Sequence, residues 1–173
     1  MSKLICLDTT IANWVFRDNS APDGTSPHEI SEFIQARKLM KMLSKAGYMI
    51  MIPSIVIAEM YCFIDNENRS KMLNKLLSKE GLFIPEFSTS TARHLSRMLY
   101  SRYYLEENNY KEFTTRSIMK YDAMILSVAL EHGANRIYTK DGDLRKYKNL
   151  PLTVCSVFDV PEEILNIGIF EEE

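Results

Sequence analysis

Residues 121–144, YDAMILSVALEHGANRIYTKDGDL, are the stretch of sequence that decides the fold. Apolar residues recur at helical spacing from Asp122 onward, and Gly133 is the type of residue that commonly ends such a helix. A short apolar strand, residues 136–139, then runs into the sequence Lys-Asp-Gly-Asp. Because α/β sheets bind their ligands at the carboxyl ends of their strands, Asp141 lies where a functional site is expected.

The rest of the chain repeats this alternation of helices and apolar strands. Residues 4–7 and 48–52 are apolar runs of strand length, and the first is typical of a strand buried on both faces of a parallel sheet. Two more strands are expected at residues 82–84 and 152–155. We expect helices from Ile11, from Ser26 to Gly47, from Ser54 to Ile64, from Asn68 to Lys79, from Ser88 through Tyr103 and over Pro161–Leu165. This order predicts the α/β class, a three-layer α/β/α fold with a short, mostly parallel sheet.

Local signals mark where helices begin and where loops lie. Ser26-Pro27-His28-Glu29 has the spacing of a capping box with proline in the first turn. Ser54, after Pro53, is expected to cap the next helix. Residues 17–25 and 106–115 are polar and are expected to be connections.

The composition is that of a soluble globular protein, and 173 residues most simply form one domain, residues 1–173. The sequence has no apolar run long enough to span a membrane and no secretory signal, so no membrane association and a cytoplasmic location are expected. Cys6, Cys62 and Cys155 are far apart in apolar contexts. They are predicted to be reduced core residues, not disulfides or zinc ligands.

The net charge of −2 conceals an asymmetry. The C-terminal segment, residues 159–173, holds six of the 23 acids and no Lys or Arg, so the remainder has 21 basic residues against 17 acids. This surplus is compatible with a polyanionic partner but does not require one.

Carboxylates from four elements are expected at one edge of the sheet. Asp8 ends the first strand, Glu59 lies within an apolar helix, Asp122 begins a helix, and Asp141 and Asp143 follow a strand. An unpaired carboxylate in an apolar helix is costly, so Glu59 is expected to be paired or to be a ligand. Oxygen ligands without His or Cys favour Mg²⁺ or Mn²⁺, and such ions assist phosphodiester hydrolysis.

Taken singly, most of these acids also have a purely structural interpretation. Asp8 could only cap a helix, and Asp141-Gly142-Asp143 could only form a turn. Asp122 could only complement the dipole of a first helical turn. Glu59 is harder to explain in this way, because its neighbours are apolar.

Four motifs in this order resemble the PIN domain, the nuclease fold of many toxin–antitoxin ribonucleases and RNA-processing enzymes. The resemblance covers nearly the whole chain and rests on these segments: LICLDTT at residues 4–10, PSIVIAEM at 53–60, KYDAMILSVAL at 120–130 and RIYTKDGDL at 136–144. It implies cleavage of RNA with Mg²⁺ or Mn²⁺. For a toxin, it also implies a small antitoxin partner and a homodimer.

The resemblance also implies roles for particular residues. Asp8, Glu59, Asp122 and Asp141 match the catalytic, metal-binding acids of the family, and Asp143 matches an additional, less regular metal ligand. The supporting hydroxyl positions match Thr139, before the last acids, and Thr9 or Thr10, after the first acid.

The sequence departs from the family pattern in two ways. Many relatives have Asn where this chain has Thr10, and the small toxins tend to be shorter. The additional length is expected in residues 17–25 and 106–115.

Basic residues suggest where a substrate would bind. Arg116 and Lys120 are closest in sequence to Asp122 and are the candidates for contact with phosphates. The wider series could line a path for RNA, but a solvated helix face is the favoured interpretation; its members are Arg93, Arg97, Arg102, Arg116 and Lys120.

Other functions remain open on the sequence. The same fold could serve as a catalytically weak module that binds RNA or protein. An aspartyl phosphatase would need a second Asp where Thr10 stands, and a receiver domain would need a phosphorylatable Asp where the strand at residues 48–52 ends in Pro53. Both of these classes are disfavoured.

Overall fold

The computed structural model describes residues 3–16, 26–62, 64–100 and 116–165. A sheet of five strands lies at its centre, in the order β3-β2-β1-β4-β5. Every neighbouring pair is parallel. The strands are β1 (Leu4–Leu7), β2 (Met49–Met51), β3 (Leu82–Phe83), β4 (Arg136–Tyr138) and β5 (Thr153–Cys155).

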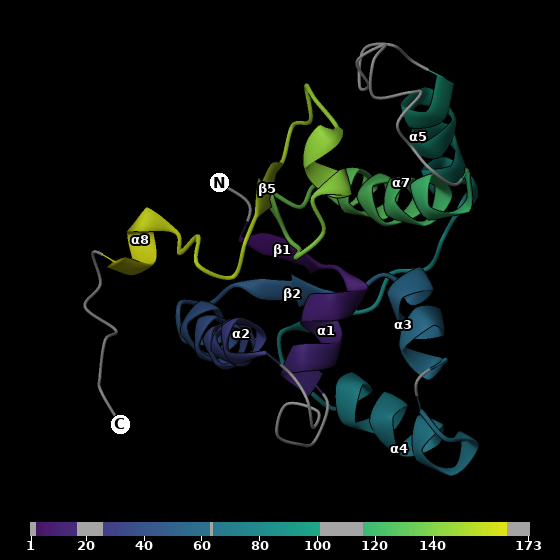
Figure 1. The fold of residues 1–173 in the computed structure, drawn as a ribbon. Coiled ribbons are helices and arrows are strands. Elements are labelled where there is room, and N and C mark those ends of the chain that lie inside the picture. The colour runs from purple at the N-terminus through teal and green to yellow at the C-terminus, as the bar shows by residue number, and fades with distance from the viewer. Residues whose placement is uncertain (1–2, 17–25, 63, 101–115, 166–173) are drawn as a thin grey trace.

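Helices flank the sheet on both faces, so the predicted α/β fold with helical layers is confirmed (Figure 1). The helices are α1 (Thr9–Phe16), α2 (Pro27–Lys45), α3 (Ser54–Tyr61), α4 (Asn66–Leu77), α5 (Thr89–Tyr100), α7 (Arg116–Glu131) and α8 (Glu162–Leu165), with a 3₁₀ turn η1 (Asp143–Lys146). In Figure 1, α2 lies on one side of the sheet and α3, α5 and α7 lie on the other. The helix α1 runs from the end of β1 between α2 and the α3–α4 pair.

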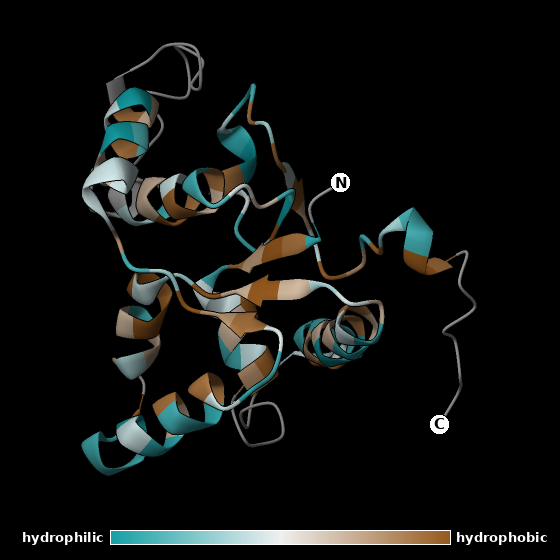
Figure 2. Cartoon of the chain, turned by 180° about the vertical axis from the view of Figure 1, so that it is seen from behind, coloured by the Kyte–Doolittle hydropathy of each residue, from teal (hydrophilic) through white to brown (hydrophobic). Residues whose placement is uncertain are grey.

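The strand β1 occupies the centre of the sheet because it is apolar throughout. Ile5, Cys6 and Leu7 are fully buried, as expected for a strand covered on both faces. The hydropathy colouring of Figure 2 shows the same arrangement, with the strands hydrophobic and the hydrophilic residues on the outer helices. The predicted core status of Cys6 and Cys155 is confirmed, whereas that of Cys62 is wrong, because Cys62 is exposed.

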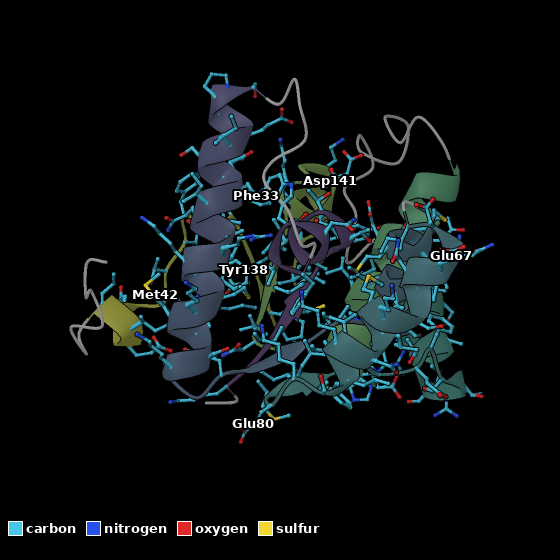
Figure 3. The ribbon with its side chains drawn as sticks, turned by 90° about the horizontal axis from the view of Figure 1, so that it is seen from below. Phe33, Met42, Glu67, Glu80, Tyr138 and Asp141 are labelled. Carbon is cyan, nitrogen blue, oxygen red and sulfur yellow. The ribbon has the colours of Figure 1, made fainter. Side chains whose placement is uncertain are left out.

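The strand order creates a switch point beside β1. The chain adds β2 and β3 on one side of β1 and then returns to add β4 and β5 on the other. In such sheets a crevice opens at the carboxyl ends of the two strands where the order reverses, here β1 and β4. Figure 3 shows two labelled acids at opposite ends of the strands. Asp141 follows the carboxyl end of β4, and Glu80 precedes the amino end of β3.

Helix ends follow the sequence signals in most places. Ser26 accepts a hydrogen bond from the Glu29 N–H at 3.3 Å, and both halves of the capping box are present. Gly47 and Gly133 have φ values of +75° and +70° and end α2 and α7 as predicted. The predicted cap at Ser54 is wrong, because Pro53 occupies the N-cap position and Ser54 is already helical.

The beginning of α7 also differs from the prediction. Since α7 starts at Arg116, Asp122 lies in its second turn and is too far from the helix end for a first-turn dipole role. Two other helices differ in extent, since α4 begins at Asn66 and α3 ends at Tyr61. The predicted connections at 17–25 and 106–115 and most of the acidic C-terminal segment lie outside the described residues.

Within the described ranges, no helix is both long and apolar enough to cross a membrane.

Candidate functional site

Asp8 lies at the switch point, directly after β1. Its carboxylate is buried, and Oδ1 accepts a 2.8 Å hydrogen bond from the Ile11 N–H at the start of α1. The Thr139 hydroxyl, at the end of β4, donates to Oδ2 of the same carboxylate. Asp8 is therefore a helix cap, as its structural interpretation requires, and it also joins β1 to the end of β4 at the switch point.

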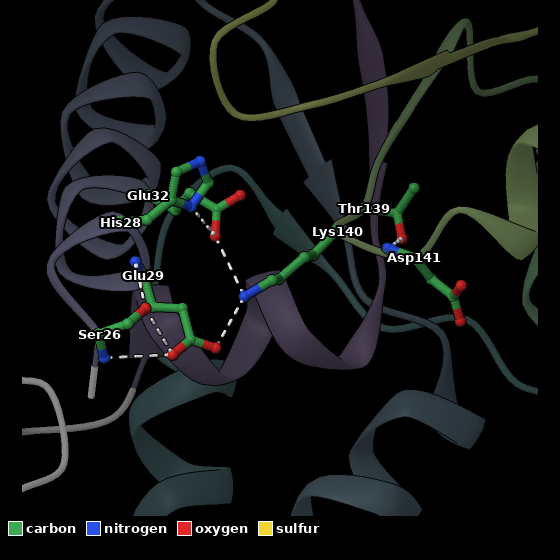
Figure 4. A network of polar contacts seen from close by, with 7 residues as sticks. All are labelled: Ser26, His28, Glu29, Glu32, Thr139, Lys140 and Asp141. Atoms are coloured by element: carbon green, nitrogen blue, oxygen red, sulfur yellow. Dashed lines mark hydrogen bonds and ion pairs between the residues drawn. The ribbon is translucent and has the colours of Figure 1, made fainter. Parts of the chain in front are cut away.

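The turn after β4 forms a chain of hydrogen bonds that leads away from Thr139. The Asp141 N–H donates to the Thr139 hydroxyl oxygen at 2.8 Å, as Figure 4 shows. The Asp143 N–H in turn donates to Asp141 Oδ1 at 2.8 Å. Asp143 begins η1, and its carboxylate is 2.6 Å from the ammonium of Lys146. The turn interpretation of these acids is thus also correct, and the turn holds Asp141 beside Asp8.

Glu59 reaches the same region from α3, which packs against α1. Its carboxylate accepts a hydrogen bond from the Thr9 hydroxyl on the first turn of α1. The expectation of a partner for Glu59 is confirmed. Glu59 is only half-buried, and its neighbour Ala58 is exposed. Thr10, the alternative position for the supporting hydroxyl, is exposed on α1.

Asp122, on α7, lies near the other four acids. Its Oδ2 is buried and has no hydrogen-bond partner among the described residues. Burial, followed by repulsion from Asp141, Asp143, Asp8 and Glu59, raises its pKa from 3.8 to about 7. The four other carboxylates therefore lie close enough to Asp122 to oppose its ionisation.

Asp8 is affected in a similar way. Burial is the main cause that raises its pKa to about 6, and the negative charge of Asp141 adds to it. The hydrogen bonds from Ile11 and Thr139 oppose this rise, because they stabilise the carboxylate. The region thus has an excess of negative charge that its own hydrogen bonds compensate only in part.

The donor set suits a hard cation. The five acids offer only carboxylate oxygens, the ligands that Mg²⁺ and Mn²⁺ prefer, and the unpaired Asp122 Oδ2 can accept such an ion. The side chains are not gathered into a coordination shell, however. Across the described ranges, no three His, Cys, Asp or Glu side chains are placed to hold one metal ion.

The two candidate phosphate contacts both lie on the helix that carries Asp122. Arg116 and Lys120 belong to the first turns of α7. Their side chains lie outside the part of the chain that the structure describes.

Sequence reasoning missed two residues beside the acids. Tyr147 is buried, and Asp122 and Asp143 add to the rise in its pKa that burial causes. Lys140 lies between Thr139 and Asp141, and its ammonium is 2.9 Å from Glu29 Oε1 and 3.1 Å from Glu32 Oε2 (Figure 4). No local signal reveals this ion-pair network, since the partners of Lys140 are more than a hundred positions away in the sequence.

Lys140 ties the acid-bearing turn to α2. Its ammonium also lies 5.3 Å from the centre of the Trp14 ring on α1, so three segments meet at one cation. The two glutamates raise the pKa of Lys140. One ammonium offsets only one of their two negative charges, but the acids that raise the pKa of Asp122 are Asp141, Asp143, Asp8 and Glu59, not these glutamates.

We expect Lys140→Gln to lower the melting temperature by about 2–4 °C, because the glutamates lose their cation. Thermal unfolding of Lys140→Gln and of Lys38→Gln, which removes an exposed lysine of α2, measures the effect at low and high salt. The difference between the two variants should shrink in 1 M salt, because exposed ion pairs are screened. Equal melting temperatures at low salt would show that the network contributes nothing.

The comparisons with known proteins agree with this description. Residues 5–150 match the PIN domain, and the chain belongs to that family. It is structurally similar to VapC toxins. A chain in the crystal structure of VapBC2 from Rickettsia felis, bound to a DNA fragment from their promoter, has a TM-score of 0.60 and 20% identity over 88% of this chain and 98% of that chain.

A second similar structure is that of Mycobacterium tuberculosis VapC20, a sarcin-ricin loop cleaving toxin. It has a TM-score of 0.52 and 15% identity over 82% of this chain and 92% of that chain. At these identities the likeness concerns the fold. No curated protein sequence matches this chain significantly.

Proposed function

We propose that this PIN domain is a metal-dependent ribonuclease that hydrolyses RNA phosphodiester bonds. The observation that carries the proposal is that four neighbouring carboxylates oppose the ionisation of Asp122, whose buried Oδ2 has no hydrogen-bond partner among the described residues. Strongly perturbed acids in a crevice are typical of functional sites. Membership of the PIN family, whose members are typically nucleases, and the RNA-cleaving activity in the name of VapC20 support the same activity.

Asp8, Glu59, Asp122 and Asp141 would hold Mg²⁺ or Mn²⁺, with Asp143 as an additional ligand. A divalent ion held there would polarise the phosphodiester and lower the pKa of a bound water. Binding of the ion would displace protons, because Asp8 and Asp122 have raised pKa values without it.

Hydroxyl groups would orient the ligands. Thr139 and the Ile11 N–H orient the two oxygens of Asp8, and Thr9 orients the carboxylate of Glu59, so the remaining lone pairs of these oxygens would be directed at the ion. We assign Thr10 a lesser supporting role, since it is exposed on the same helix. Arg116 and Lys120 would contact phosphates of the RNA from the beginning of α7.

We further propose that the chain is the toxin of a toxin–antitoxin pair, with a small antitoxin as partner and a homodimer as its own assembly. The similar Rickettsia felis structure is a VapBC2 complex, which supports a partner of this kind. A cytoplasmic location would follow from this role.

The second candidate function is a catalytically weak module of the PIN fold that binds RNA or protein. The observation that favours it is that, among the described side chains, the acids are not gathered around one ion. The two candidate functions differ in catalysis: the nuclease would cleave RNA, whereas the module would bind RNA or protein without cleaving it.

Cleavage of mixed RNA and single-stranded DNA with Mg²⁺ or Mn²⁺ tests the proposal. The wild type is compared with Asp8→Asn and Asp122→Asn, and Glu80→Gln serves as a control because this exposed acid lies at the opposite end of the strands. We expect RNA cleavage that requires metal and is lost in both Asn variants but kept in Glu80→Gln. A folded wild type that neither cleaves RNA nor binds metal by calorimetry would support the binding module instead.

A further inference from the structure

A basic cavity of about 410 Å³ lies at the far end of α1 from the acids. Four of its lining side chains are cationic, and none of the others is acidic: the cations are Arg37, Lys41, Lys45 and Lys79. The first three belong to α2, and Lys79 lies two residues after the end of α4. Val15 of α1 also lines the cavity. A chain with a net charge of −2 thus gathers four positive charges around one hollow.

Neighbouring groups hold two of these cations in place. The Arg37 Nε donates to the Trp14 carbonyl at 2.9 Å, and its guanidinium lies 4.4 Å from the centre of the Phe33 ring. The ammonium of Lys79 lies 4.7 Å from the centre of the Phe16 ring. The positions of both charges are therefore fixed by contacts with aromatic rings and the backbone.

The other two cations have no described acid to balance them. Lys41 and Lys45 are one helical turn apart on α2, both exposed, and neither forms an ion pair with a carboxylate of the described residues. Burial and then the charge of Lys75 lower the pKa of Lys79, as expected for a cation without a nearby anion. A ligand with several negative charges would relieve this repulsion.

One short helix connects this cavity to the acids. Thr9, on the first turn of α1, pairs with Glu59, and Val15, on the last turn, lines the cavity. An eight-residue helix is about 12 Å long. An RNA chain whose cleaved bond lies at the acids would therefore reach the cavity within a few nucleotides.

We propose that the cavity lined by Arg37, Lys41, Lys45 and Lys79 binds backbone phosphates of a single-stranded RNA whose scissile bond lies at the acids. This inference rests on the proposed nuclease function and adds a second contact region for the same substrate. RNA is favoured over an acidic protein segment because the lining is mainly cationic and offers few apolar side chains to anchor a peptide. Substrates that extend past the acids gain these contacts, whereas a dinucleotide does not.

The test compares the double variant Lys41→Gln/Lys45→Gln with the control Lys38→Gln/Lys71→Gln, which removes the same charge from exposed positions outside the cavity. Binding of a labelled 12-nucleotide single-stranded RNA is measured by fluorescence anisotropy in EDTA, across a series of salt concentrations. We expect the cavity variant to bind at least fivefold more weakly. The slope of log Kd against log salt should fall by about 1–1.5, since each single-strand phosphate contact accounts for ~0.7. The control should change affinity less than twofold.

Three results would overturn the inference. Equal losses in the two double variants would show a diffuse charge effect, and unchanged RNA affinity in the cavity variant would exclude phosphate binding there. Loss of binding to a decaglutamate peptide with unchanged RNA affinity would assign the cavity to an acidic protein segment. Cleavage with metal provides a second readout, in which the cavity variant should lose kcat/KM on the 12-nucleotide RNA but not on a dinucleotide.

The proposed nuclease function is judged separately. If the wild type cleaves RNA and the cavity variant behaves as the control does, only the cavity inference fails. If the wild type cleaves no RNA, the nuclease proposal fails, and the salt dependence in EDTA still decides whether the cavity binds RNA.

Discussion

Asp122→Asn is expected to stabilise the metal-free protein at pH 8 and to reduce metal-dependent cleavage by more than about 100-fold, since outer partners of metal ligands alone are typically worth 10–100-fold. The substitution removes a charge that four neighbouring carboxylates repel, and the buried Oδ2 of Asp122 has no hydrogen bond among the described residues that could be lost. Allowing for the partial exposure of Asp122, we expect a gain of about 2 kcal/mol, or about 4–8 °C in melting temperature.

The gain should depend on pH in a defined direction. The folded protein holds a proton on Asp122 up to a pKa of about 7, whereas the unfolded chain releases it near 3.8. Between these values the folded state binds more protons, so its stability falls as pH rises. The difference between Asp122→Asn and the wild type should therefore be near zero at pH 4, grow up to pH 7 and then stay constant.

Chemical denaturation in EDTA from pH 4 to pH 8 measures this difference. Addition of Mg²⁺ or Mn²⁺ should stabilise the wild type more than the variant, because only the wild type keeps the full set of acids. A variant that is less stable than the wild type at pH 8 in EDTA would contradict the assignment of Asp122 to a repulsive cluster.

Thr139→Val is expected to have the second-largest effect. The Thr139 hydroxyl donates to Asp8 Oδ2 and accepts from the Asp141 N–H, so valine removes both hydrogen bonds in a region where Thr139 itself is 1% exposed. Unpaired buried polar groups cost about 1–3 kcal/mol. Cleavage should fall by about 10–100-fold, since both acids lose the contact that orients them.

Thr139→Ser is the matched control, because it keeps the hydroxyl and removes only a methyl group. We expect it to lose about 1 kcal/mol of stability and to keep its activity within about threefold of the wild type. Urea denaturation and initial cleavage rates of both variants provide the measurements. If serine, which keeps the hydroxyl, reduced cleavage as much as valine does, the loss could not be assigned to the hydrogen bonds of that hydroxyl.

Sequence patterns predicted the sheet well because its signals are local. The run at residues 4–7 is apolar throughout, and such a run can be buried only in the centre of a covered sheet. The capping box at Ser26 and the glycine at 133 mark helix ends through their own backbone geometry. The start of α7 differs from the prediction, because residues 116–121 mix polar and apolar side chains and carry no capping signal.

The candidate site was predictable only in its list of acids. That Asp8 and Asp141 lie at the same side of the sheet follows from a general rule about the carboxyl ends of parallel strands, whereas the approach of Asp122 depends on how α7 packs. What could not be predicted is how each acid is held, because these contacts join distant positions. Lys140 pairs with Glu29 across 111 residues of sequence, and no periodicity marks either residue.

The place of β1 beside β4 has a consequence for how the protein is made. Asp8 and Thr139 are 131 residues apart in sequence and yet form one hydrogen bond, so the crevice cannot exist until β4 has been synthesised. At about 5–20 residues per second, many seconds pass on the ribosome between the first acid and its partner. A nascent chain therefore carries Asp8 and Glu59 without the rest of the cluster, and the proposed nuclease would be inactive until the residues that follow β4 have been made.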